Sequence, residues 1–160
     1  MASDYLLVMT GIPGESLDTA FPASVEIQSF SWGVSNPGSS STGGGAGTGK
    51  ANFQDISFST TVNKSTPKLF SFLVLGTHIA TAVFHLRKQG KDGQQEYLTY
   101  TFSDCVVSSL SHGGGGGGEV TESFSLNYTK FEISYKPQKA DQTLDTAIEA
   151  GYDMKATKKV

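Results

Sequence analysis

The glycine-rich segment GGAGTGK at residues 44–50 comes closer than any other part of the chain to a ligand-binding motif. It has the glycines and the lysine of a phosphate-binding P-loop, in which backbone N–H groups and the lysine hold the phosphates of a nucleotide. That motif needs Ser or Thr after the lysine to reach magnesium, and Ala51 stands there instead. A P-loop also begins a helix, whereas the strand-like segment 53–62 follows this one. A nucleotide-hydrolysing enzyme is therefore the weakest interpretation of the sequence.

The other side chains that could take part in catalysis or metal binding are scattered along the chain. His78, His85 and His112 do not have the spacing of metal ligands, and Cys105, as the single cysteine, supplies neither a thiolate cluster nor an intrachain disulfide. The six glycines at 113–118 satisfy the dinucleotide pattern GxGxxG as any such run would, and strand-like residues follow them. Neither a GxSxG elbow nor an HExxH helix is present. The sequence nominates no catalytic residue, metal ligand or cofactor, and predicts that the protein is not an enzyme.

Length and composition indicate one globular domain over residues 1–160. The formal net charge of −3 gives no basic surface for nucleic acid. No apolar run approaches the roughly 18–20 residues of a membrane span, and residues 1–5 lack the basic region of a signal peptide. Charged residues make up 17% of the chain, against about 25% in an average domain. Gly, Ser and Thr take their place, and this surplus calls for an explanation.

Alternation of apolar and polar residues predicts that most of the chain is β-strand. The expected strands are residues 4–10, 25–34, 53–62, 79–88, 95–111, 119–136 and 148–155, with a hairpin turn at 89–93. Three strands have an expected apolar face, formed by Ile56, Phe58 and Val62, by Ala82, Phe84 and Leu86, and by Leu98, Tyr100, Phe102, Val106 and Leu110. A helix at 141–150 competes with the last strand, but the clean alternation from Ile148 onward favours the strand. Phe30 and Trp32 are interpreted as core residues.

The segment 119–136 contains a slip in its alternation. Its apolar residues at 120, 124, 126 and 128 share even numbers, whereas those at 131, 133 and 135 share odd numbers. A bulge or bend near Thr129–Lys130 must absorb one residue, since otherwise half of these side chains would face the wrong way. A long strand that bends and changes face is what a sheet needs in order to close, so we expect a small barrel or sandwich.

One helix is expected between the strands. Thr66 can cap it, Pro67 suits the first helical position, and Gly76 can end it. Its apolar side chains nearly encircle the axis, which predicts packing against the sheet or against a neighbouring subunit. The run from Phe70 to Leu75 could instead be a buried strand.

Two glycine-rich loops, at 35–50 and 113–118, interrupt the pattern. An irregular loop longer than about 12–15 residues is usually functional or disordered, so residues 35–50 are either a contact segment or a simple tether. The shorter run could be a hairpin tip.

Low charge and open strand edges favour contact with other protein surfaces, and head-to-tail contacts that close form rings. The residues alone therefore predict a β domain that oligomerises.

Eight stretches in order along nearly the whole chain resemble one known family. They are GIPGES at 11–16, FSWG at 30–33, GKANFQD at 49–55, KSTP at 64–67, EYL at 96–98, VVSSLS at 106–111, EVTE at 119–122 and YKPQKAD at 135–141. Together they resemble the Hcp family (haemolysin-coregulated proteins), the tube protein of bacterial type VI secretion systems. GYDMK at 151–155 is similar to the last strand of that family, except that Tyr152 stands where Trp is expected.

The resemblance implies a mainly β fold. Its expected form is a two-sheet, β-barrel-like domain with one short flanking α-helix, similar to phage tail tube proteins, that assembles as a hexameric ring. In the family, rings stack into a hollow tube that a contractile sheath expels together with a spike or tip protein, and small effector proteins travel in the lumen. The implied location is the bacterial cytoplasm, followed by secretion through the type VI apparatus without a signal peptide. The implied role needs no cofactor, nucleic acid or membrane insertion. The alternative is a soluble ring-shaped chaperone or carrier for effectors that builds no long tube.

Two sets of site residues are carried over by position. Ser31 corresponds to a strand near the lumen and is a candidate cargo-facing residue, with an incidental strand serine as the alternative. The loop at 35–50 corresponds to the extended loop that contacts the adjacent ring or subunit. Its candidate ring-contact residues are Ser39, Ser40, Ser41, Thr42, Gly43, Gly44, Gly45, Thr48 and Lys50.

Overall fold

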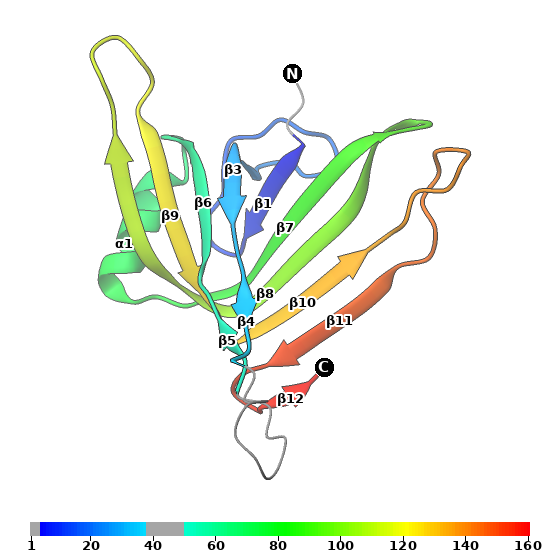
Figure 1. The fold of residues 1–160 in the computed structure, drawn as a ribbon. Coiled ribbons are helices and arrows are strands. Elements are labelled where there is room, and N and C mark those ends of the chain that lie inside the picture. Colours follow the sequence, from blue (N-terminus) through cyan, green and yellow to red (C-terminus); the bar gives the residue numbers. More distant parts are fainter. Residues whose placement is uncertain (1–3, 38–49) are drawn as a thin grey trace.

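A computed structural model of the chain describes residues 4–37 and 50–160. In this part the chain forms two packed β-sheets and one α-helix (Figure 1), which confirms the predicted mainly β fold. Sheet A has the spatial order β12-β11-β10-β8-β7-β1-β2, and sheet B has the order β3-β6-β9-β8, so that β8 belongs to both. The elements of sheet A are β1 (Tyr5–Met9), β2 (Val25–Glu26), β7 (Ile79–Gly90), β8 (Gly93–Gly113), β10 (Lys130–Tyr135), β11 (Ile148–Asp153) and β12 (Lys158–Lys159). The remaining elements are β3 (Ser29–Ser31), β4 (Val34–Ser35), β5 (Asn52–Phe53), β6 (Ile56–Thr61), α1 (Thr66–Leu75) and β9 (Thr121–Asn127).

The long hairpin of β7 and β8 forms the centre of sheet A, and its second strand, β8, continues into sheet B. Its turn consists of residues 91–92, and Gly90 pairs with Gly93 across it, as the sequence predicts. Ala82, Phe84 and Leu86 are all buried on one face, again as predicted. This outcome follows from a period of two in a strand, because alternate side chains point to the same side of the sheet.

The bend predicted near residues 129–130 is confirmed, because two residues separate β9 from β10. Both strands pair with β8, but β9 belongs to sheet B and β10 to sheet A. The chain therefore passes from one sheet to the other along a single partner strand. The slip in alternation is the sequence trace of this change of sheet.

Beside the junction of β9 and β10, β8 also changes which of its two faces points into the core. Phe102 of β8 pairs directly with Phe131 of β10, and both rings are buried. The next buried residues, Cys105 and Tyr128, each lie three positions away from these phenylalanines rather than two. Asp104 has a positive φ of 49° in β8, a backbone conformation that breaks the regular pleat. β8 and the paired β9–β10 segment thus change their core-facing side at the same place, and the core continues without interruption from sheet A to sheet B.

The turn-over of β8 corrects one predicted face. Val106 was expected to share the face of Phe102, but it is half-buried, whereas Cys105 and Val107 are buried. The physical reason is the reversal at Asp104, which moves Cys105 and Val107 into the core, until the register shift between Val107 and Ser109 returns Leu110 to it.

Two of the expected strands are divided in the structure. Residues 25–34 form three short strands rather than one, because β2 pairs in sheet A, β3 pairs in sheet B and β4 pairs only with β5. Residues 53–62 are divided into β5 and β6. Val62 was expected beside Ile56 and Phe58 in the core, but it follows the end of β6 and is exposed, and Thr60 has the buried position.

The helix α1 spans Thr66–Leu75 and excludes the alternative strand. Thr66 was expected as the cap but is the first helical residue, and Ser65 is the N-cap without a side-chain cap bond. Asn63 organises this end, because its Oδ1 accepts hydrogen bonds from the N–H and hydroxyl of Ser65. Gly76 ends the helix with φ 65°, a left-handed conformation in which glycine avoids the strain of a side chain.

The C-terminal segment is a strand, as the alternation predicts. β11 pairs with β10 over its whole length, and the short β12 pairs with β11 at the edge of sheet A. The competing helix at 141–150 does not form.

Candidate functional site in a serine-lined sheet

The outward face of sheet B carries two rows of serines that cross all four strands. The first row, in the order β3, β6, β9 and β8, is Ser31, Ser57, Ser125 and Ser109. The second row is Ser29, Ser59, Ser123 and Ser111. Directly paired residues of an antiparallel sheet point to the same face. We call these eight residues the serine face.

The opposite face of the same four strands is hydrophobic. Its row, in the same strand order, is Phe30, Phe58, Phe124 and Leu110. The rings of Phe58 and Phe124 are buried with centroids 5.3 Å apart, and Phe30 packs edge-on against Phe84 of sheet A at 4.9 Å. A slip of one residue in any strand would place serine in the core and a phenylalanine or leucine side chain in solvent. The hydrophobic row therefore fixes the register that aligns the serines.

The serine face is formed by a repeated tripeptide. SFS occurs at 29–31, 57–59 and 123–125, and SLS occurs at 109–111. Sequence reasoning identified Ser31 but missed the other seven serines. The repeat was a usable signal, because three copies of SFS and one SLS on separate strands suggest a shared two-sided sheet.

The chemistry of the serine face is that of uncharged hydroxyls. The Ser125 hydroxyl lies 2.7 Å from that of Ser108 and 2.5 Å from that of Ser109, where a register shift in β8 places two residues opposite one. The other members, except the half-buried Ser59, are exposed. A hydroxyl both donates and accepts hydrogen bonds, so this surface can contact many polar groups without requiring a charge.

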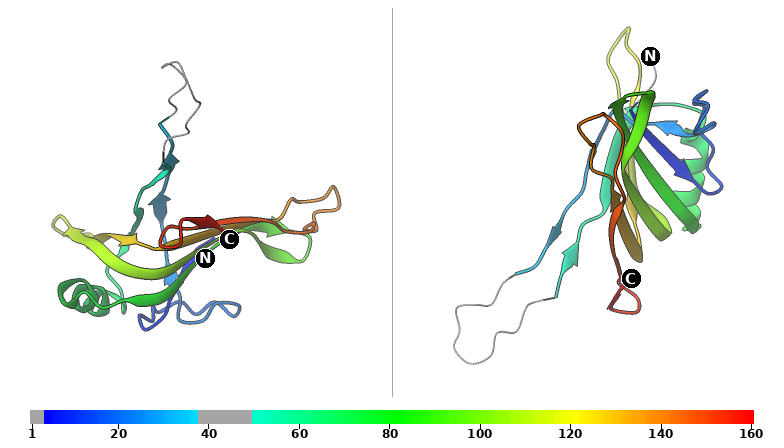
Figure 2. Two further views of the ribbon diagram at one scale, coloured as in Figure 1. Left: turned by 90° about the horizontal axis from the view of Figure 1, so that it is seen from below. Right: turned by 90° about the vertical axis from the view of Figure 1, so that its right-hand side faces the viewer.

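The hairpin of β4 and β5 extends away from the two sheets (Figure 2). Eight of the nine expected ring-contact residues lie between its strands at positions 39–48, outside the described residues, and only Lys50 is described. Lys50 is exposed and lines a pocket of about 220 Å³ at the base of the hairpin. The other lining residues are Ala51, Phe53, Asp55, Asn127, Tyr128, Tyr152 and Met154.

A chain of hydrogen bonds holds the base of this hairpin to the barrel. The Trp32 indole N–H donates to the Tyr128 hydroxyl at 2.5 Å, and this hydroxyl donates to the Gln54 carbonyl at 2.6 Å. Burial raises the pKa of Tyr128 to about 12, and the bond from Trp32 opposes this rise. The Trp32 ring also stacks on Phe131 with centroids 4.3 Å apart. Phe30 and Trp32 thus pack against the core, as predicted.

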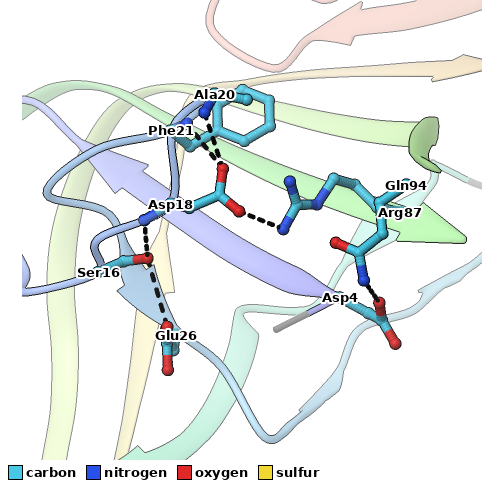
Figure 3. Close-up of polar contacts among 8 residues, drawn as sticks. All are labelled: Asp4, Ser16, Asp18, Ala20, Phe21, Glu26, Arg87 and Gln94. Carbon is cyan, nitrogen blue, oxygen red and sulfur yellow. Dashed lines mark hydrogen bonds and ion pairs between the residues drawn. The ribbon is translucent and has the colours of Figure 1, made fainter. Parts of the chain in front are cut away.

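The loop at 10–24, which contains the GIPGES motif, folds back over β1 (Figure 3). Asp18 is bound to Arg87 of β7 at 2.7 Å and accepts two backbone N–H bonds from Ala20 and Phe21. The side-chain bond from Arg87 lowers the pKa of Asp18 despite its partial burial. Phe21 stacks on His85 with centroids 3.9 Å apart. These contacts hold the loop in place at the sheet.

Each histidine is paired with one carboxylate. His78 binds Asp104, His85 binds Glu96, and His112 binds Glu122. The Glu96 carboxylate also accepts a bond from Thr99, and the bonds from His85 and Thr99 lower its pKa against the opposing effect of burial. Within residues 4–37 and 50–160, no group of three or more His, Cys, Asp or Glu side chains could hold a metal ion.

The family profile described as "Type VI secretion system effector, Hcp" matches residues 5–135 of this chain. The chain belongs to the Hcp family. It is 40% identical over 146 residues to "Protein hcp1" of Pseudomonas aeruginosa, which covers 91% of this chain and 90% of that protein. The family resemblance predicted from the sequence is thereby confirmed.

Two solved structures are similar to this Hcp chain over nearly its full length. "Structure of a type six secretion system protein" has a TM-score of 0.92 and 26% identity, covering 99% of this chain and 100% of the other. Hcp1 from Salmonella typhimurium has a TM-score of 0.83 and 30% identity, with full coverage of both chains.

Hcp family membership places the protein among the structural, secreted components of type VI secretion systems and supports oligomeric assembly. A hexameric ring is consistent with its relatives. The single helix of the described residues is too short to cross a membrane.

Proposed function

We propose that this Hcp protein forms hexameric rings that stack into a hollow tube, and that the serine face lines its lumen. The type VI apparatus expels the tube, with a contractile sheath and a spike or tip protein as partners. Small effector proteins travel inside. The protein is made in the bacterial cytoplasm and leaves through the apparatus without a signal peptide. It performs no chemistry in this role.

The serine face is the observation that carries this proposal. A tube wall must hold different cargo proteins loosely and then release them, so it cannot use strong charges or large apolar side chains. Apart from the buried Ser125, these serines present hydroxyls on four adjacent strands that provide weak hydrogen bonds to any polypeptide surface. Ser31 belongs to this surface and is exposed, which supports its role as a cargo-facing residue.

The decisive experiment locates the serine face within the assembled ring. Ser57→Cys is labelled with a maleimide-linked electron-dense cluster, and class averages of rings are recorded by electron microscopy. Cys105 is fully buried and does not compete for the label. Label density inside every ring supports the lumen assignment, whereas density on the outer rim contradicts it. A parent protein that remains monomeric at every concentration contradicts the ring itself.

The stacking of rings distinguishes the tube hypothesis from the alternative hypothesis of a soluble carrier. Micrographs of concentrated protein should show end-to-end stacks of rings. Rings that remain separate at every concentration contradict the tube and favour a carrier for effectors.

The ring-contact role of the loop at 35–50 is also a proposal. The position of its β4–β5 stem supports this role, because the hairpin extends beyond the barrel. Deletion of residues 38–47 should leave the fold and the rings intact and shorten the stacks. Removal of Gly115 and Gly116, from the other glycine-rich loop, is the matched control. Unfolding of the first deletion variant, or unchanged stacking, would overturn this assignment.

A further inference from the structure

The pocket at the base of the β4–β5 hairpin, here called the hairpin pocket, lies beside one end of the serine face. Asp55 and Asn127 both line it, and the Asn127 amide donates a 2.8 Å hydrogen bond to the Asp55 carboxylate. Asp55 stands two positions before Ser57 in the chain, and Asn127 stands two positions after Ser125. Alternate residues of a strand point to the same face, so Asp55 and Asn127 continue the serine face to the edge of the pocket.

The walls of the hairpin pocket are mostly aromatic. Phe53 and Tyr152 stack with ring centroids 5.7 Å apart, where β5 and the end of β11 meet (Figure 1). Tyr128 contributes a third ring and Met154 contributes a thioether. Aromatic rings and methionine sulfur both gain from contact with a further aromatic ring beyond the gain from burial alone. The lining therefore favours an aromatic ligand over an aliphatic one.

The size of the hairpin pocket fits a single side chain. Pockets for drug-sized ligands measure about 300–1,000 Å³, whereas this pocket measures about 220 Å³. A helix or strand of a partner cannot enter such a space, but one aromatic ring can. At protein interfaces, tryptophan and tyrosine side chains that fill pockets of this kind are among the residues that contribute most to affinity.

One wall of the hairpin pocket adds a hydrogen-bond acceptor. The Asp55 carboxylate is half-buried and is held in place by its bond from Asn127. An ionised carboxylate accepts hydrogen bonds, and the N–H of tryptophan or the O–H of tyrosine can donate to it, whereas phenylalanine and leucine have no side-chain donor. Lys50, also in the lining, balances the charge of Asp55, so the ligand itself needs no charge.

The hydroxyls of the serine face bond to any polar group, so they cannot distinguish one cargo protein from another. The hairpin pocket can make this distinction, because it requires a ring of suitable size with a donor on its edge. We infer that the hairpin pocket selects cargo by binding one tryptophan or tyrosine side chain that an effector protein exposes, with the N–H or O–H of that side chain bound to Asp55. The inference rests on the proposed tube function and names the chemistry of the cargo.

Soluble amino-acid derivatives test the pocket in rings of the full chain. The probes are the N-acetyl amides of tryptophan, tyrosine, phenylalanine and leucine. The readout is the methyl resonance of Met154 in protein labelled with ¹³C-methyl methionine. This resonance should shift to saturation, with the tryptophan and tyrosine probes binding about tenfold more tightly than the leucine probe. The resonance of Met9, which is buried in the core, should not respond. Equal affinity for all four probes, or no shift of Met154, overturns the inference.

Two adjacent substitutions form a matched pair. Ala51 lines the hairpin pocket, so Ala51→Phe should fill it and abolish binding of the probes. Asn52 is exposed and lies outside the lining, so Asn52→Phe should bind the probes as the parent does. Circular dichroism should show the parent fold in both variants. Unchanged binding in Ala51→Phe would place the probes elsewhere and contradict the inference.

Asp55→Ala tests the hydrogen-bond acceptor. It should weaken binding of the tryptophan and tyrosine probes toward the affinity of the phenylalanine probe. The phenylalanine probe should bind Asp55→Ala and the parent equally, which would show that the pocket is intact. Equal weakening of all three aromatic probes would contradict the role of Asp55 as acceptor.

The state of the rings during the titration separates this inference from the proposed function. If rings form with the serine face in their lumen but no probe binds, cargo selection by the pocket is wrong and the tube stands. If a probe disperses the rings or their stacks, a second copy of the chain occupies the pocket, and its assignment to cargo is wrong. A parent protein that stays monomeric contradicts the proposed function itself.

Discussion

Tyr152 of β11 stacks on Phe53 of β5, with ring centroids 5.7 Å apart and planes inclined by 17°. This contact ties the C-terminal strand to the base of the extending hairpin. Both rings line the pocket that also includes Lys50. The family resemblance leads one to expect Trp at position 152, and the structure shows that a tyrosine ring makes this stack. The departure from the family pattern therefore preserves an aromatic contact.

Replacement of Tyr152 should show how much the aromatic stack contributes to the stability of the fold. Tyr152→Ala should lower the free energy of unfolding by about 1–3 kcal/mol, since it removes a stacked and partly buried ring. Tyr152→Trp should keep most of that stability. Urea unfolding at one fixed protein concentration measures both, because assembly adds to apparent stability. Equal losses in the two variants would show that the aromatic stack is not the source of stability.

The His112–Glu122 pair leads to a second prediction. Glu122 is fully buried, its Oε2 lies 2.9 Å from His112 Nε2, and its Oε1 has no hydrogen-bond partner in the structure. His112→Ala should lower the free energy of unfolding by about 3 kcal/mol, because it leaves a buried carboxylate without its partner. Adding Glu122→Gln should recover part of the loss, since a buried amide costs less than a buried charge.

His78→Ala is the matched control for this cycle. His78 also binds a carboxylate, that of Asp104 at 2.6 Å, but both side chains are more than one-third exposed. Loss of an exposed pair changes stability only slightly, because solvent screens the two charges. A comparable loss in His78→Ala and His112→Ala would contradict the importance of burial at Glu122.

Local alternation was sufficient to predict the regular parts of this fold. The β7–β8 hairpin, the helix and the last strand were all predicted, because the pattern of apolar and polar residues in each segment reflects which of its side chains are buried. The same reasoning predicted the change of sheet near residue 129 but was wrong at residues 25–34, where the chain also changes sheet. Residues 25–34 have continuous β-forming character, but the division into three strands depends on partners in β1, β6 and β5. Such partners are distant in sequence, so local pattern cannot reveal them.

The serine face shows the same limit of local sequence patterns even more clearly. Ser31 was identified only through the family resemblance, and its seven companions were missed. Their alignment depends on the registers of three strand pairs, which the hydrophobic row on the other face determines. The surplus of serine became interpretable only once these registers were known.

The Asp18–Arg87 ion pair predicts a dependence of stability on acid. The side-chain bond from Arg87 lowers the pKa of Asp18 below its ordinary value of 3.8, so the unfolded state binds a proton more readily than the folded state. The stabilisation is therefore present above pH 4 and is lost as the pH falls through the lowered pKa. Asp18→Asn should lower the free energy of unfolding by about 2–3 kcal/mol at pH 7. Its stability should also vary less than that of the parent below pH 4.

Urea unfolding of the parent and Asp18→Asn between pH 2 and pH 7, in buffers of equal ionic strength, measures this effect. The exposed Asp92, in the β7–β8 turn, provides the control variant Asp92→Asn. Parallel pH profiles for the parent and Asp18→Asn would contradict the assigned role of the ion pair.

Alkaline conditions should destabilise the fold through two buried acids. Burial raises the pKa of the Cys105 thiol from 9.0 to about 12, and burial also raises the pKa of Tyr128 from 10.0 to about 12. Both groups ionise more readily in the unfolded chain, so stability is complete below pH 9 and declines as the pH rises toward 12. Each group contributes a slope of up to about 1.4 kcal/mol per pH unit. Cys105→Ala should delay the decline until Tyr128 begins to ionise in the unfolded state, near pH 10. Urea unfolding of both proteins at closely spaced pH values measures this onset, and a parent whose stability is constant between pH 9 and pH 10 would refute the assignment to Cys105.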